Sequence, residues 1–154
     1  MVTTDVNQSV FIDTNILIQL HVDVAPRHIE AFAAVERLIA EQRALWISRQ
    51  ILREYASVLT RPQPYAPPLS AREVSVQIRL LETRYLVADE DAATTAALCG
   101  LLDTILIGGK QIHDANIVAT MLTNNITHLL TLNTADFIRF SGIITLITLD
   151  ELLN

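Results

Sequence analysis

The chain has 154 residues, of which 51% are hydrophobic and 18% are charged, and its formal net charge at pH 7 is −6. This length predicts a single domain over residues 1–154, large enough to bury a core without disulfide staples. The acidic balance excludes a protein that holds nucleic acid by bulk positive charge, because such binders are basic.

Membrane and export signals are not visible in the sequence. It has no run of 18 or more apolar residues, so we expect no membrane span. Residues 1–5 show neither the basic nor the apolar region of a signal peptide, so we expect a cytoplasmic protein. We expect the single cysteine, Cys99, to be a small core residue. The high apolar content predicts a surface that is covered by a partner or a second subunit.

Apolar runs and periodicities predict alternating strands and helices. The strands are expected at about residues 10–12, 44–48, 85–87, 128–131 and within 143–149. The helices are expected at about residues 15–20, 26–41, 48–60, 70–84, 89–107 and 114–124. This order predicts an α/β fold, a three-layer α/β/α sandwich with a mostly parallel sheet of about five strands.

Two local signals refine this outline. In the second helix, Phe32, Val35, Leu38 and Ile39 recur at helical spacing and predict its buried stripe. Residues 61–68 hold four of the five prolines, so this segment is expected to be an extended surface loop. Whether this loop borders a substrate path, meets a partner or is a plain connection stays open.

The first predicted strand ends at an acid. Asp13 directly follows the apolar run, and in an open α/β sheet the carboxyl ends of the strands are where ligands bind. The same side chain could serve only as the N-cap of the next helix. Three more acids in comparable positions favour a site.

Glu54 and Asp114 lie on helix faces that the sequence predicts to be buried. Glu54 has apolar neighbours about one turn away in both directions, where a carboxylate must be paired or bound to a metal. The alternatives are a salt bridge to Arg53 or Arg61, or a helix that exposes this position. Asp114 heads the apolar face of its helix, although a plain role at the helix start is the alternative.

Asp136 follows the end of the fourth predicted strand, and it too could cap a short helix. Because the strand ends of a parallel sheet meet at one edge, the four acids are expected to converge. Four carboxylates without opposing bases repel one another, and a hard divalent cation such as Mg²⁺ or Mn²⁺ removes that repulsion. Such a site supports in-line attack of water on a phosphodiester.

The segments that carry these acids resemble the PIN-domain nucleases, and within them the VapC-like ribonuclease toxins of toxin–antitoxin pairs. They read VFIDTN at 10–15, ILREY at 51–55, IHDANIVATM at 112–121 and HLLTLNTADF at 128–137. Together they span nearly the whole chain in the family's order, and the ordered set is more specific than any one segment. The resemblance implies a parallel sheet of about five strands flanked by helices.

The resemblance also implies roles for individual residues. The acidic quartet that would hold Mg²⁺ or Mn²⁺ is Asp13, Glu54, Asp114 and Asp136. The polar residues that would orient these acids or bound waters are Asn15, Thr131 and Asn133. Four basic residues near the motifs could hold RNA phosphates or be ordinary surface charges: Arg53, Arg61, Lys110 and Arg139. An RNA substrate, a protein antitoxin and a homodimer are further implications.

Three functions stay open at this point. The first is a metal-dependent endoribonuclease restrained by an antitoxin, and the second is an RNA-processing PIN nuclease without one. The third is a non-catalytic PIN-like binding module, which would leave a quartet position vacant, whereas all four are filled here. A Mg²⁺-dependent phosphohydrolase fits less well, because it typically has a second acid two residues after the first, where this chain has Asn15.

Overall fold

The structure is a computed structural model, and it describes residues 9–154. The strands are β1 (Ser9–Ile12), β2 (Ala44–Ser48), β3 (Leu86–Ala88), β4 (His128–Leu130) and β5 (Thr145–Ile147). The α-helices are α1 (Thr14–His21), α2 (His28–Ala40), α3 (Arg49–Leu59), α4 (Ala71–Arg84), α5 (Ala92–Thr104), α6 (Gln111–Thr123), α7 (Thr134–Phe137) and α8 (Leu149–Leu153). A 3₁₀ turn, η2 (Ile138–Phe140), follows α7.

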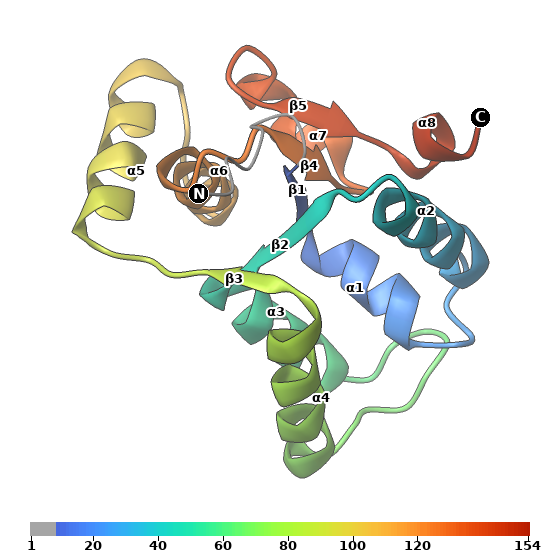
Figure 1. Ribbon diagram of the computed structural model, residues 1–154. Helices are drawn as coiled ribbons and strands as arrows, with labels where there is room; N and C mark the ends of the chain where they lie inside the picture. Colours follow the sequence, from blue (N-terminus) through green and yellow to red (C-terminus); the bar gives the residue numbers. More distant parts are fainter. Residues whose placement is uncertain (1–8) are drawn as a thin grey trace.

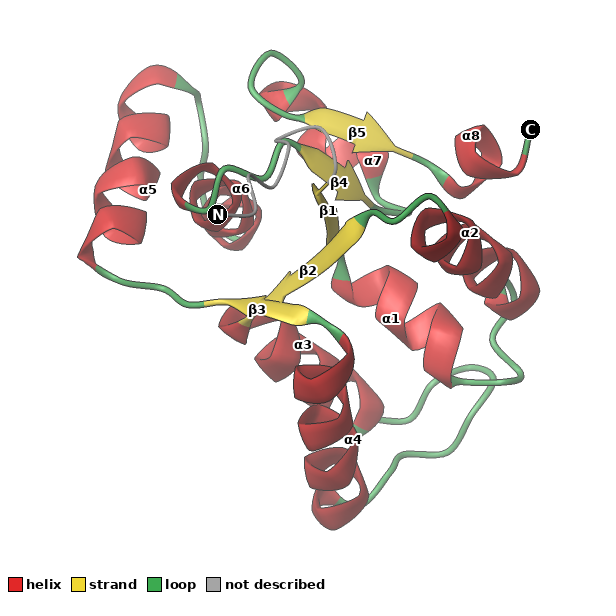
Figure 2. Cartoon of the chain, viewed as in Figure 1, coloured by secondary structure: helices red, strands yellow, loops and turns green. Residues whose placement is uncertain are grey.

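The five strands form one sheet in the order β3-β2-β1-β4-β5, and every pairing is parallel. Helices α5 and α6 lie on one side of the sheet, and α1 and α2 lie on the other (Figures 1 and 2). This arrangement confirms the predicted α/β class and the three-layer sandwich. The long connections contain helices because parallel neighbours cannot be joined by a tight hairpin.

The centre of the sheet holds its topological switch point. From β1 the chain moves outward through β2 and β3, and it then returns to the other side of β1 with β4. Open α/β sheets bind ligands beyond the carboxyl ends of the two strands at such a point. Here those ends are followed by Asp13 and Thr131, and the Asp13 N–H donates to the Leu130 carbonyl at 3.1 Å. The two strand ends are therefore held side by side.

The core surrounds β1 and fixes the frame of the site. The strand's apolar side chains Val10, Phe11 and Ile12 are completely buried, as are Val118 and Ala119 of α6. Burying a large apolar side chain contributes about 1.5–3 kcal/mol. The residue at the end of β1 is therefore placed by the most deeply buried part of the fold.

Three predicted core positions are wrong. In α2, Val35 and Leu38 are buried as expected, but Phe32 is 55% exposed and Ile39 is 53% exposed. The face that meets the protein is completed instead by Ala31 and Ala34, whose small side chains let the helix approach closely. Cys99 is exposed, because α5 buries only Thr94 and Leu101 and presents the cysteine away from them.

Several boundaries differ from the predicted ones by a few residues. Helix α6 begins at Gln111, three residues before the expected start, because the glycine-containing turn at 108–109 ends sooner than the apolar periodicity suggests. Helix α5 ends at Thr104 rather than near 107, and β3 is shifted by one residue. The segment 61–68 is irregular, as predicted, with one isolated bridge between Gln63 and Ala66. Among the described residues, no helix has the length and apolarity needed to cross a membrane.

Candidate active site

Asp13 lies at the tip of β1 and is at the same time the N-cap of α1. Its Oδ1 accepts the Thr14 N–H at 2.7 Å, and its Oδ2 accepts the Thr131 hydroxyl at 2.7 Å and the Asn15 amide at 3.1 Å. The residue is only 5% exposed. The two alternatives raised by the sequence, an N-cap and a site residue, are therefore compatible, because the same carboxylate caps α1 and faces the cavity described below.

The polar residues Asn15 and Thr131 surround Asp13. The Asn15 Nδ2 also reaches the Thr131 hydroxyl at 3.4 Å, and its Oδ1 accepts the Leu132 N–H at 3.1 Å. The Thr131 hydroxyl in turn accepts the Asn133 N–H at 3.0 Å. These bonds tie the start of α1 to the turn after β4. Asn133 contributes its backbone here, and its exposed side chain makes no capping bond to α7.

Glu54 lies on α3, a helix that is capped by Ser48 at the end of β2. Its Oε2 accepts the Thr14 hydroxyl at 2.8 Å, and its Oε1 accepts the Gln50 amide at 2.7 Å. Within the described chain it forms no ion pair with either neighbouring arginine, since Arg53 lies instead 3.9 Å from Glu90. The salt-bridge explanation for Glu54 is therefore excluded for this structure.

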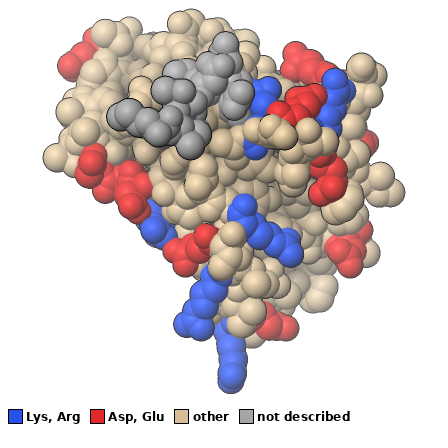
Figure 3. Space-filling model, in the orientation of Figure 1, with Lys and Arg blue, Asp and Glu red and all other residues tan. Residues whose placement is uncertain are grey.

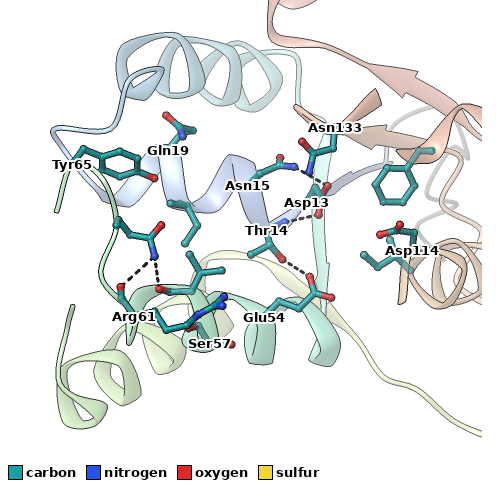
Figure 4. Close-up of a pocket in the computed structure, with 15 residues that line it drawn as sticks. Asp13, Thr14, Asn15, Gln19, Glu54, Ser57, Arg61, Tyr65, Asp114 and Asn133 are labelled. Carbon is teal, nitrogen blue, oxygen red and sulfur yellow. Dashed lines mark hydrogen bonds between the residues drawn. The ribbon is translucent and has the colours of Figure 1, made fainter. Parts of the chain in front are cut away.

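Three of the four predicted acids line one cavity of about 430 Å³. Asp13 and Glu54 form one side of it, and Asp114 of α6 lies across from them (Figure 4). The cavity continues past Ile18 and Val58 to the proline-rich segment, where its lining residues are Arg61, Gln63 and Tyr65. One edge of this cavity thus carries the acids, and the far edge is formed by the loop.

Two of the acids, Asp13 and Asp114, have a raised pKa. Burial, with a smaller contribution from the charge of Glu54, raises the pKa of Asp13 from 3.8 to about 6, although its three hydrogen bonds oppose this. Burial, followed by the charges of Asp136, Asp13 and Glu54, raises the pKa of Asp114 from 3.8 to about 6. All four acids therefore act on a common region, which carries excess negative charge when they are ionised.

The remaining predicted residues differ in how close they lie to the cavity. Asp136 is exposed on α7 and does not line it, yet its charge raises the pKa of Asp114. The charge of Arg139 lowers that same pKa, although its guanidinium donates to the Leu106 carbonyl, and Arg61 lines the cavity directly. Arg53 and Lys110 are exposed residues outside the cavity lining.

The carboxylate oxygens of the acids are suitable ligands for a hard divalent cation. In this structure, however, they are not gathered into a closed metal-binding cluster. Among residues 9–154, no three acidic, histidine or cysteine side chains are gathered at metal-binding distance. Asp13, Glu54 and Asp114 nevertheless share one cavity and offer only oxygen atoms, and no basic residue of the described part of the chain forms an ion pair with them. Mg²⁺ and Mn²⁺ prefer such oxygens and keep several waters, so they do not require every carboxylate to bind directly.

Sequence reasoning missed three residues of this network: Thr14, Gln50 and Asn116. Thr14 bonds both Asp13 and Glu54, and Gln50 joins Glu54 to α6 through its side chain. One signal was available, because Gln50 is four residues before Glu54 and thus on the same helix face. The contact between Gln50 and Asn116 spans 66 positions and has no local signature.

Comparisons with known proteins agree with this geometry. No curated protein matches the chain in sequence. The VapBC-1 structure from nontypeable Haemophilus influenzae is 20% identical with a TM-score of 0.66, covering 92% of this chain and 98% of that one. A toxin–antitoxin complex from Klebsiella pneumoniae is 23% identical with a TM-score of 0.63, covering 91% and 97%.

A third solved structure extends the likeness. Mycobacterium tuberculosis VapC20, described as a toxin that cleaves the Sarcin-Ricin loop, is 20% identical with a TM-score of 0.57, covering 78% of this chain and 86% of that one. At these identities the likeness shows a shared fold. The family model described as PIN domain matches residues 10–143, which include all four acids. The chain therefore belongs to the PIN domain family.

Proposed function

We propose that this chain is an endoribonuclease that depends on Mg²⁺ or Mn²⁺ and acts as the toxin of a type II toxin–antitoxin pair. The observation that carries the proposal is the cavity that Asp13, Glu54 and Asp114 line, with Asp136 close enough to raise the pKa of Asp114. Membership of the PIN domain family supports the nuclease activity.

Each acid has a proposed role in this reaction. Asp13 and Asp114 would bind the cation directly, and Glu54 and Asp136 would bind the same or a second ion, directly or through water. A cation held by these acids would supply an activated water for attack on the phosphodiester and would balance the charge of the scissile phosphate. Asn15 and Thr131 keep the Asp13 carboxylate in one orientation, because they donate to its Oδ2 from opposite segments of the chain.

The surface charge favours a selective RNA substrate over indiscriminate binding. On the face shown in Figure 3, basic side chains gather mainly over α4, and acidic ones are scattered along both edges. Only Arg61 and Arg139, of the four predicted basic residues, lie near the acids. With a net charge of −6, nonspecific attraction to phosphates is weak, so shape and local contacts must select the RNA.

A protein antitoxin is the proposed partner. The support is that the structures from Haemophilus influenzae and Klebsiella pneumoniae, which share this fold, are toxin–antitoxin complexes. Large apolar side chains on this chain's surface would also be covered by an antitoxin or by a second copy in a homodimer. The most exposed of them are Val24, Ile29, Leu106 and Ile138. An RNA substrate and such a partner imply a cytoplasmic protein.

The proposal is tested by RNA cleavage with Mg²⁺, with Mn²⁺ and with EDTA, after any copurified protein has been removed. We expect cleavage only with metal. The cleavage rate should fall at least about 100-fold in Asp13→Asn and Asp114→Asn, because replacing even a residue that only supports a metal ligand typically costs about 10–100-fold in metal affinity or activity. Asp103→Asn, an exposed acid on α5, is the matched control and should cleave normally. Normal cleavage by folded Asp114→Asn would overturn the site. No cleavage together with no Mn²⁺ binding would favour a non-catalytic binding module.

A further inference from the structure

The side chain of Gln50 joins the helices that carry Glu54 and Asp114. It is 5% exposed, and its Nε2 donates to the Glu54 Oε1 at 2.7 Å and to the His113 carbonyl at 2.9 Å. Its Oε1 accepts the Asn116 Nδ2 at 2.8 Å. One amide thus contacts α3 on one side and two points of the first turns of α6 on the other.

These three bonds define which way the Gln50 amide faces. A carboxylate and a backbone carbonyl can only accept, so the nitrogen of Gln50 must face Glu54 and His113. The Asn116 amide nitrogen can only donate, so the oxygen of Gln50 must face Asn116. A rotation of the amide by 180° would oppose its oxygen to both acceptors. Glu54 and the His113 carbonyl therefore fix the orientation of the Gln50 amide, and Asn116 supports that orientation by donating to the Gln50 oxygen.

On its other side Glu54 receives the Thr14 hydroxyl at 2.8 Å. Each of its two oxygens thus accepts one hydrogen bond, and each keeps a further lone pair for another ligand. A residue that donates a hydrogen bond to a metal ligand orients that ligand. The ligand then loses less conformational freedom when the metal binds, so the entropic cost of binding is smaller.

We propose that Gln50, supported by Asn116, is a positioning residue that holds Glu54 and the start of α6, with Asp114, in the arrangement that binds the divalent cation. This inference rests on the proposed function. It adds that two residues outside the acidic quartet, the neutral amides Gln50 and Asn116, determine how the acids on α3 and α6 lie relative to each other.

Two substitutions separate positioning from simple electrostatics. Gln50→Glu and Asn116→Asp each add a negative charge beside the acids, and charge alone would tighten the binding of a cation. Positioning predicts the opposite. In Gln50→Glu a carboxylate faces Glu54. In Asn116→Asp the new acid cannot donate to the Gln50 oxygen, so the amide either loses this support or turns its oxygen toward Glu54. We expect the Mn²⁺ dissociation constant of the full chain to rise about 10-fold in both, measured by titration calorimetry.

Neutral variants and a matched control complete the experiment. Gln50→Met removes the donor without adding charge and should weaken Mn²⁺ binding to a similar degree, whereas Gln77→Glu on α4, outside the cavity lining, should leave it unchanged. Thermal unfolding without metal identifies any variant that fails to fold. Asn116 is only partly buried, so Asn116→Asp keeps the test valid if a Gln50 variant unfolds.

The outcomes distinguish this inference from the proposed function. Unchanged or tighter Mn²⁺ binding by folded Gln50→Glu or Asn116→Asp, beside a wild type that binds Mn²⁺ and cleaves RNA, overturns the positioning role alone. A wild type that neither binds Mn²⁺ nor cleaves RNA overturns the proposed function and the inference together.

Discussion

The two sides of the candidate site are built differently. On the side formed by β1, α1 and α3, the Asp13 carboxylate accepts three hydrogen bonds and the Glu54 carboxylate accepts two. On the side formed by α6 and α7, the carboxylates of Asp114 and Asp136 accept no hydrogen bond from residues 9–154. The fold thus orients one pair of acids and leaves the other pair held by backbone position alone.

This difference has a physical consequence for metal binding. Carboxylates that already accept hydrogen bonds lose little freedom when a cation arrives, whereas free ones must be ordered by it. We infer that the Asp13 side is set by folding, and that the Asp114 side becomes ordered when charge is neutralised. Substitutions on the first side should therefore change the stability of the metal-free chain, and those on the second side should change its response to pH and metal.

The largest stability effect is expected at Thr131. Its hydroxyl is completely buried, donates to Asp13 and accepts the Asn133 N–H, so Thr131→Val removes a donor and leaves a backbone N–H without a partner. We expect the free energy of unfolding to fall by about 1–3 kcal/mol, the cost of unsatisfied buried polar groups. Denaturant unfolding measures this. Thr145→Val, at an exposed position of β5, is the control and should stay within about 0.5 kcal/mol. Equal effects at both positions would show that the hydrogen bonds of the Thr131 hydroxyl do not stabilise the Asp13 side.

The pH dependence of Asp114 gives a smaller effect. Its pKa is raised to about 6, chiefly by burial and then by the neighbouring acids. Between about pH 4 and 6 the folded chain retains a proton that the unfolded chain has released, so this group makes the metal-free chain less stable as pH rises. Asp114→Asn removes this loss of stability, because the amide does not ionise. We expect the variant to gain about 1 kcal/mol over the wild type between pH 4 and 7, less than the full pKa shift implies because solvent screens the group.

This prediction is checked by unfolding both proteins in urea across that pH range in the presence of EDTA. Two parallel curves would show that folding does not raise the pKa of Asp114. Asp13→Asn is a useful contrast, because three donors face that carboxylate and an amide nitrogen would oppose at least one of them. We therefore expect no comparable gain for it, although its pKa is raised in the same direction.

The oriented side of the site was the more predictable from sequence. Asp13 follows a buried strand, and Thr131 follows the strand beside it, so the parallel order alone brings them together. Asp136 could be predicted less well, because α7 is only four residues long and its packing decides where the acid points. The Gln50–Asn116 contact could not be predicted, since it depends on how α3 packs against α6. The prediction that Phe32 is buried was wrong for a related reason. Helical periodicity identifies the apolar residues on one face of α2, but it does not show which of them contact the core.

The smallest expected effect concerns the far end of the cavity, where Arg61 belongs to the proline-rich segment. Its Nε donates to the Ser57 carbonyl at 2.9 Å, and the side chain extends along α3 toward Glu54 (Figure 4). For the proposed ribonuclease, an exposed contact of this kind with an RNA phosphate is worth at most about 1 kcal/mol, so Arg61→Ala should raise KM about 3–5-fold and leave kcat unchanged. The Arg53 side chain is 67% exposed, lies 3.9 Å from Glu90 and does not line the cavity, so Arg53→Ala should change KM by less than about twofold.

Steady-state cleavage at two salt concentrations tests this pair of variants. Loss of a phosphate contact weakens binding and also reduces its dependence on salt. Both changes should therefore appear in Arg61→Ala and neither in Arg53→Ala. A larger effect at Arg53 would place the RNA along α3 on the side that faces Glu90. In that case the cavity beyond Val58 would not be part of the substrate path, and the proline-rich segment would be a plain connection between α3 and α4.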